Sequence, residues 1–181
     1  MPDSLLKKMF FKIIDTISET IGRLISCLVI ILTLILSYEI VARYVFGAPT
    51  KWVFDTSYML GGTFFLMGEA FTLKHKQHVR IDILYGRFSK RTRAAIDVFF
   101  YLVLFFPLWI GILYALIPYV AFSWEMGEKS MQGYWQPVIY PFKTVMPIGV
   151  GLFLLQGLAE FCRSLLILIK GENSPGQVKE A

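Results

Sequence analysis

The residues with the clearest capacity for chemistry lie in one short stretch, Thr72–Asp82, which reads TLKHKQHVRID. It contains both histidines of the chain, His75 and His78, and histidines three residues apart can share one helix face and bind a metal ion or a haem iron. The stretch also contains the cations Lys74, Lys76 and Arg80 and the acid Asp82. A cationic setting repels a metal ion, and a bis-histidine haem in a membrane needs histidines inside the spanning helices. The sequence therefore predicts no catalytic, cofactor-binding or metal site in this chain.

The composition indicates what surrounds this stretch. Of the 181 residues, 56% are hydrophobic and only 17% are charged, whereas soluble domains carry about 25% charged residues. The net charge of +5 fits membrane topology better than nucleic-acid binding, because the cations border apolar runs. The sequence predicts an integral membrane protein that contacts lipids and no nucleic acid.

Four segments are long and apolar enough to cross a bilayer, which needs about 20 residues per helix. They cover residues 21–41, 52–73, 95–123 and 144–169. In the third segment Pro107 and Pro118 are expected to kink or end the helix, and Pro147 is expected near the first turn of the fourth. The predicted fold class is an all-α membrane protein with four transmembrane helices in residues 21–169.

Both termini are expected to lie outside the bilayer. In residues 1–20, apolar side chains such as Phe10, Ile13 and Ile17 recur at helical spacing, with lysines on other faces. This pattern predicts an N-terminal amphipathic helix on the membrane surface, after which the chain turns into the bilayer. Residues 170–181, KGENSPGQVKEA, are polar and predict a disordered tail.

The distribution of Lys and Arg predicts the orientation. The link between the second and third segments carries Lys74, Lys76, Arg80, Arg87, Lys90, Arg91 and Arg93. The other two links carry only Arg43 and Lys51, and Lys129 and Lys143. Because positive loops stay in the cytoplasm, both termini and the basic link are predicted to be cytoplasmic.

The basic link is expected to have structure of its own. The run SKRTRAAIDV is typical of a helix start, with Ser89 as its N-cap, so we expect an interfacial segment ahead of the third transmembrane helix. A structural polar cluster is expected at the inner face, in which local hydrogen bonds or ion pairs hold the link against this helix. Its members would be Glu69, His78, Arg80 and Asp82.

The acids inside the apolar segments lie near helix ends. Glu39 precedes Arg43 by four residues, and Glu160 precedes Arg163 by three; both spacings allow ion pairs within a helix. Asp55 lies one turn inside the outer end of the second segment. Because ion pathways use polar groups at the membrane midplane, these positions favour local charge pairing. No nucleophile, phosphate loop or carboxylate pair predicts an enzyme.

Three patches of the sequence carry a resemblance to a known family. The first is EIVARYVFG, with Arg43, Tyr44 and Phe46; the second runs from Gly61 to HVRID, with His78 and Asp82. The third holds Glu128, Ser130, Trp135, Pro141, Lys143, Pro147, Gly149 and Gln156. Together they resemble the small membrane subunit of TRAP transporters (tripartite ATP-independent periplasmic transporters, the DctQ-like family), and the resemblance extends over residues 21–169. One departure concerns the acids that often follow the tryptophan opening the second helix, because Trp52 is followed by a single acid, Asp55.

The resemblance implies a supporting role in a bacterial inner membrane. Its partners would be a large multi-span subunit, which carries the substrate and sodium sites and moves like an elevator, and a periplasmic protein that captures organic acids or related solutes. This chain would hold no cofactor, would brace the large subunit and would help to dock the periplasmic protein. The docking candidates at the outer face are Arg43, Lys51, Glu125, Glu128, Lys129 and Lys143.

Two other functions stay open. The small subunit of a tripartite tricarboxylate carrier has the same four-helix architecture, and only the motif patches argue against it. The membrane anchor of a respiratory enzyme binds haem or quinone and needs a histidine within a spanning helix, where this sequence has none.

Overall fold

The computed structural model describes residues 2–75 and 88–170, with side chains from residues 9–75 and 88–169. The regular elements are α1 (Pro2–Tyr44), α2 (Val53–Lys74), α4 (Lys90–Phe100), the π-helical turn η1 (Tyr101–Phe105), α5 (Phe106–Glu125) and α6 (Tyr140–Lys170). Within these ranges, β pairing is limited to one isolated antiparallel bridge between Lys129 and Val138. The predicted all-α class is confirmed.

Three stretches of helix are long and apolar enough to cross a membrane: Met9–Tyr44, Lys90–Glu125 and Tyr140–Ile169. In length and composition these stretches agree with the first, third and fourth predicted crossings. The predicted second crossing is α2, whose 22 residues extend over about 33 Å, close to the thickness of a bilayer core. Its composition is less apolar because it carries Asp55, Glu69 and several hydroxyl side chains, so it is not among the three.

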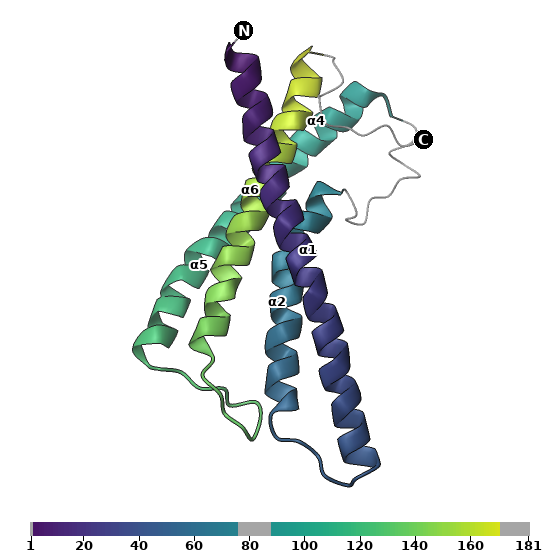
Figure 1. The fold of residues 1–181 in the computed structure, drawn as a ribbon. Helices are drawn as coiled ribbons and strands as arrows, with labels where there is room; N and C mark the ends of the chain where they lie inside the picture. The colour runs from purple at the N-terminus through teal and green to yellow at the C-terminus, as the bar shows by residue number, and fades with distance from the viewer. Residues whose placement is uncertain (1, 76–87, 171–181) are drawn as a thin grey trace.

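The helices are arranged around α6, which packs against α1, α2, α4 and α5 (Figure 1). The helix α2 packs against both α1 and α6, and this shelters the polar residues on it from lipid. The two loops 45–52 and 126–139 lie at the same end of the molecule, and the N-terminus of α1 lies at the opposite end (Figure 1). We call the end with the two loops the loop end.

The N-terminal segment differs from its prediction. Residues 2–44 form one uninterrupted helix of 43 residues, so the expected turn between a surface helix and the first crossing is absent from α1. One side of this segment packs against α6, where Phe11 and Ile14 contact Ala159. The sequence places only one glycine in α1, Gly22, and it allows close contact with the Phe71 ring of α2 instead of a bend. Packing against two helices keeps α1 straight where its amphipathic pattern alone predicted a turn.

The third crossing is longer than predicted. It begins at Ser89, whose side-chain oxygen accepts a 3.2 Å hydrogen bond from the Thr92 amide, so the predicted N-cap is confirmed. From there α4, η1 and α5 form one continuous helical rod. The interfacial segment predicted ahead of this crossing falls largely on residues 76–87, which lie outside the described residues. Neither proline ends it: Pro107 follows the π-helical turn, and Pro118 lies inside α5. A π-helical turn absorbs the missing amide and the bulk of the ring at Pro107 through one wider turn.

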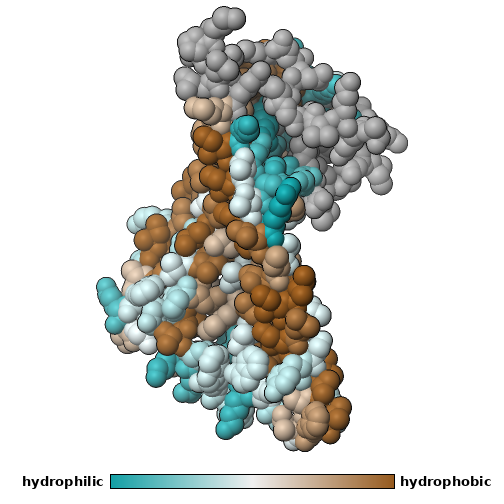
Figure 2. Space-filling model, viewed as in Figure 1, coloured by the Kyte–Doolittle hydropathy of each residue, from teal (hydrophilic) through white to brown (hydrophobic). Residues whose placement is uncertain are grey.

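The fourth crossing also begins earlier than predicted. The helix α6 begins at Tyr140, so Pro141 occupies the first turn, where proline is tolerated, and Pro147 lies in the interior. The predicted tail, 170–181, lies outside the described residues except for Lys170, which ends α6. Apolar side chains cover the middle of the visible face, with more polar residues toward the loop end (Figure 2).

Candidate functional site

The loop 126–139 is held in place by a group of polar side chains that we call the loop cluster. Its members are Asp55, Ser123, Glu128, Ser130 and Lys143. Glu128 lies at the centre, where its Oε2 accepts a 2.6 Å hydrogen bond from Ser123 Oγ and pairs with Lys143 Nζ at 2.5 Å. The Lys143 ammonium and the Ser123 hydroxyl hold the pKa of Glu128 below the ordinary value of a glutamate. These contacts fix the start of the loop to the first turn of α6.

Lys143 is a buried cation with two kinds of partner. Its side chain is only 7% exposed, and its ammonium lies 4.2 Å from the centre of the Tyr119 ring as well as against Glu128. A cation over an aromatic face is stabilised by the negative charge of the ring surface. Lys143 was predicted to dock a partner, and the structure places it inside the loop cluster.

Asp55 joins the loop cluster to α2. It is 1% exposed, and its Oδ1 accepts a 2.6 Å hydrogen bond from Ser130 Oγ. Its Oδ2 has no hydrogen-bond partner among the described residues. Gly133 lies directly against this oxygen, so that any side chain at position 133 would collide with the carboxylate. The loop is thus tied to α2 by one buried acid and one close contact.

The loop 45–52 is closed by Glu39, which accepts hydrogen bonds from Arg43 and Thr50. The ion pair between Arg43 Nη2 and Glu39 Oε1 measures 2.6 Å and confirms the predicted spacing argument. The Thr50 amide donates to Glu39 Oε2 at 3.1 Å, and the Thr50 hydroxyl donates to the same oxygen. One carboxylate therefore fixes both the last turn of α1 and the loop that follows.

The surface at the loop end presents charges and large side chains. Among the predicted docking residues, Arg43, Lys51, Glu125 and Lys129 are exposed, and Glu128 is partly exposed. Beside them the loop exposes Met131 and Tyr134 almost fully, at 92% and 94%, and Trp135 at 52%. A prediction based on charge did not select Met131 and Tyr134; the available signal was an aromatic-rich segment between two apolar helices.

A second group of polar side chains, which we call the α1–α6 network, lies toward the other end. Its members are Asp15, Ser18, Gln156, Glu160 and Arg163. Ser18 donates a 2.8 Å hydrogen bond to Gln156, whose amide donates to Asp15 at 3.3 Å. Arg163 pairs with Asp15 at 2.5 Å and with Glu160, which confirms the predicted pair within α6. Gln156 is fully buried, so water does not compete for its hydrogen bonds.

The sequence did not predict the α1–α6 network as a unit. The spacing of Glu160 and Arg163 was visible, but Asp15 and Ser18 are 138 or more residues away from their partners. The available signal was local: Gln156 and Glu160 lie one turn apart in a mostly apolar stretch of α6. Polar residues in such a helix generally face protein partners.

The predicted inner-face cluster is described only in part. Glu69 lies in the last two turns of α2 and has interaction partners, while His78, Arg80 and Asp82 lie outside the described residues. Next to Glu69, at the end of α2, Lys74 Nζ pairs with Glu19 Oε2 of α1 at 2.6 Å. His75 Nε2 lies 3.5 Å from the same oxygen, and its Nδ1 lies 3.0 Å from the Phe71 carbonyl. The start of the TLKHKQHVRID stretch thus ties α2 to α1.

Metal-ligating side chains do not gather in the described part of the chain. There, no three His, Cys, Asp or Glu side chains are close enough to hold a metal ion together. The chemistry of both polar groups is instead hydrogen bonding and charge pairing between helices. Such contacts position helices and loops.

A bundle of long apolar helices joined by polar contacts is typical of one class of protein, the integral membrane proteins. The family model for tripartite ATP-independent periplasmic transporters, DctQ component, matches residues 32–166. The chain belongs to this family, and so it is a TRAP transporter small membrane subunit, a transport component and not an enzyme. No curated protein gave a significant match.

Family membership decides between the functions that the sequence left open. The match supports the TRAP component over the tricarboxylate carrier subunit and the respiratory anchor. The loop cluster lies wholly inside the matched range, whereas Asp15 and Ser18 of the α1–α6 network precede it. Membrane localisation and association with other TRAP components follow from the family.

Proposed function

We propose that this chain braces a large multi-span membrane subunit and helps to dock a periplasmic substrate-binding protein during sodium-coupled uptake of organic acids or related solutes. Membership of the DctQ component family carries this proposal. The substrate and sodium sites would belong to the large subunit, and this chain would hold no cofactor. Its contribution would be mechanical: a fixed set of helices against which a moving transport domain is displaced.

The exposed apolar surface supports a bracing role. Leu24, Ile30 and Leu34 on α1 are each exposed by about two thirds of their surface, at 65–68%, and Tyr114 on α5 is 81% exposed. Such residues must face lipid or the helices of a partner. With α2 and α6 at the centre, α1 and α5 offer two outer faces for a larger bundle.

We also propose four crossings with both termini in the cytoplasm of a bacterium and the loop end in the periplasm. Since α1 and α5 both end at the loop end, the chain has to return between them, and α2 is the helix that runs back from the loop 45–52. The polar residues of α2 are tolerated in a crossing because α1 and α6 pack against it. The basic residues Lys74, Lys90, Arg91 and Arg93 then lie on the cytoplasmic side, in agreement with the positive-inside rule.

Docking would use the exposed charges of the loop end. Arg43, Lys51 and Lys129 are exposed there, and the loop cluster fixes the loop that carries Lys129. A charged rim on a rigid loop steers an encounter more than it tightens the final complex.

The bracing role is tested by removing this chain from cells that keep the other two components. We expect sodium-driven uptake to be lost and the large subunit to become less abundant, and the full-length chain to co-purify with the large subunit when it is restored. Normal uptake by the large subunit alone would disprove the proposal.

The docking role is tested separately with the assembled transporter. Lys129→Glu is expected to weaken the apparent affinity for the loaded binding protein several-fold at low salt, and less at high salt. Lys90→Glu, a matched charge reversal at the opposite end, is the control. Equal effects of the two variants would remove the docking role while leaving the bracing role intact.

A further inference from the structure

The outward face of α5 carries polar groups at a depth where lipid offers no hydrogen bonds. Trp124 marks the level of one membrane surface: its ring centroid lies 4.4 Å from that of Tyr140, and its Nε1 donates a 2.9 Å hydrogen bond to Thr144. Tryptophan and tyrosine gather at membrane–water interfaces. Tyr114 precedes Trp124 by ten residues, about 15 Å along the helix, and half of the hydrocarbon core is also about 15 Å thick. Tyr114 therefore lies near the middle of the bilayer.

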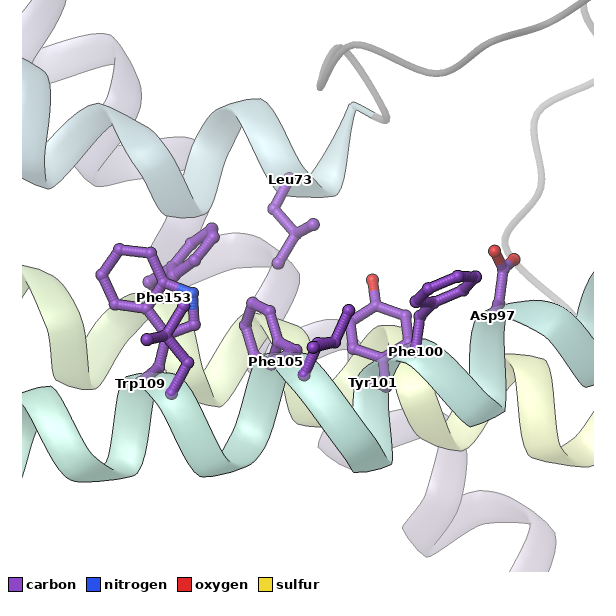
Figure 3. A pocket seen from close by; sticks show the side chains of 9 residues that line it. Leu73, Asp97, Phe100, Tyr101, Phe105, Trp109 and Phe153 are labelled. Atoms are coloured by element: carbon purple, nitrogen blue, oxygen red, sulfur yellow. The ribbon is translucent and has the colours of Figure 1, made fainter.

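Tyr114 points away from the rest of the described chain. On the inner side of the rod, Phe105 and Trp109 lie against Phe153 of α6, with ring centroids 5.0 and 4.8 Å from that of Phe153 (Figure 3). Tyr114 follows Trp109 by five residues, which turns it about 140° away around the helix. Its side chain is 81% exposed. The phenol hydroxyl thus projects outward, where it meets either lipid tails or a partner.

A backbone carbonyl on the same face lacks its usual partner. In an α-helix each carbonyl accepts from the amide four residues further on, so the Tyr114 carbonyl would pair with residue 118. That residue is Pro118, which lies inside α5 and has no amide hydrogen. Pro118 is exposed, so the missing hydrogen bond lies on the outward face. Tyr114 thereby presents both a donor and an acceptor to whatever covers α5.

Lipid tails cannot satisfy these two groups. A hydroxyl or carbonyl without a hydrogen bond is strongly disfavoured in hydrocarbon, and carbonyls freed by proline are satisfied by neighbouring helices, hydroxyl side chains or water. Within the described chain, α6 packs on the opposite side of α5. Gly111, three residues before Tyr114, leaves room for an approaching backbone, because a Cβ added there would meet no described atom within 4 Å. The face is therefore suited to a helix with a hydrogen-bonding side chain.

We propose that the face of α5 formed by Gly111, Tyr114 and Pro118 binds a transmembrane helix of the large subunit. A side chain of that helix would accept a hydrogen bond from the Tyr114 hydroxyl and donate one to the Tyr114 carbonyl. A carboxamide has both a donor and an acceptor, and so does an aliphatic hydroxyl. Such bonds would fix the depth and the rotation of α5 against its partner, which a brace requires. The inference rests on the bracing role proposed above, and it adds the contact surface and the chemistry of the partner.

The contact is tested by photo-cross-linking of the full-length chain in its transporter complex in native membranes. Benzoylphenylalanine replaces Tyr114, or replaces Leu108 as the control, which is 58% exposed and lies about 120° away around α5. We expect position 114 to cross-link to the large subunit several-fold more than position 108 does. Cross-links from position 114 to lipid alone, or to a second copy of this chain, would overturn the proposal.

The hydrogen bond is tested by Tyr114→Phe, which removes one oxygen and leaves the ring. We expect the affinity of the chain for the large subunit, measured by subunit exchange in mild detergent, to fall about three- to tenfold. Tyr44→Phe is the matched control: Tyr44 is 80% exposed at the end of α1, where water replaces a lost partner. An affinity in Tyr114→Phe equal to that of the unaltered chain would overturn the proposal.

These measurements separate the inference from the bracing role. If the chain co-purifies with the large subunit and uptake depends on it, while position 114 cross-links to lipid alone, the bracing role stands and the inference fails. If the chain does not co-purify with the large subunit, both fail.

Discussion

The loop cluster and the α1–α6 network have different structural roles. The α1–α6 network joins two helices through side chains that are 138–148 residues apart, and it encloses two carboxylates with one guanidinium. In the loop cluster, Glu128 bonds to residues five and fifteen positions away and its side chain is 38% exposed. The first group holds helices together within crossings, whereas the second gives a surface loop its conformation.

The difference between the two groups predicts which lost contacts lower the stability of the protein most. When one member of a buried ion pair is removed, the other member is left charged and without solvent. At an exposed site, water replaces the lost contact. The Arg163 side chain is 13% exposed and that of Glu160 is 8%, so breaking their pair should be costly. In the loop cluster Lys143 and Asp55 are buried as well, and Glu128 is its partly exposed member. The substitutions below test this contrast from the largest expected effect to the smallest.

Arg163→Gln is expected to cause the largest loss. It leaves Asp15 and Glu160 without their guanidinium partner, and breaking a buried ion pair costs about 3–5 kcal/mol. We expect a marked fall in the yield and melting temperature of the purified complex. Arg23→Gln is the control, because Arg23 also pairs with an acid but its side chain is 78% exposed. Equal losses in both variants would contradict the contrast between the two kinds of pair.

Gly133→Ala is expected to cause a smaller, local loss. The added methyl group collides with the Asp55 carboxylate, and overpacking of this kind costs about 1–3 kcal/mol. We expect faster proteolysis of the loop 126–139, with the association of α1 and α6 unaffected. Gly61→Ala is the control, since open space surrounds that position. Loss of the whole complex on Gly133→Ala would show that the loop cluster also holds the helices.

Acidification is expected to destabilise the loop cluster, with a smaller effect than Gly133→Ala. The pKa of Glu128 is lowered in the folded protein by Lys143 and Ser123. The contribution of Glu128 to stability is therefore fully present above the ordinary glutamate pKa of about 4.3. That contribution is lost as the pH falls from this value through the lower folded-state pKa. We expect loop proteolysis to rise over this window, measured with an acid-tolerant protease. In Glu128→Gln the rise should disappear, and a rise of the same size in that variant would assign it to another group.

Whether a contact could be predicted from the sequence depended on how far apart its residues lie along the chain. Ion pairs three or four residues apart, such as Glu160 with Arg163, and the Ser89 N-cap follow from local spacing, and both are confirmed. The apolar runs predicted four crossings, and three of them coincide with helical stretches long and apolar enough to cross a membrane. The Asp55–Ser130 bond and the α1–α6 network could not be predicted, because they depend on how helices from distant parts of the chain pack. For the same reason the straight path of α1 was missed, since its packing against α6 overrides its surface-helix pattern.

The ion pair between Lys74 and Glu19 is intermediate between the two polar groups. It is therefore the most informative test of what distinguishes them. It joins two helices, as the α1–α6 network does, but its side chains are 20% and 26% exposed at the end of α2. If burial sets the cost, a double-mutant cycle of Lys74→Gln and Glu19→Gln should give a coupling of about 0–1 kcal/mol, the range of solvated pairs. If joining two helices sets the cost, the coupling should approach the several kcal/mol expected of Arg163. The cycle is measured from melting temperatures of the complex, with Arg23→Gln and Glu19→Gln as the reference cycle, because Arg23 pairs with the same acid within one helix. A coupling for Lys74 well above that reference would make helix joining, and not burial, the property that separates the two polar groups.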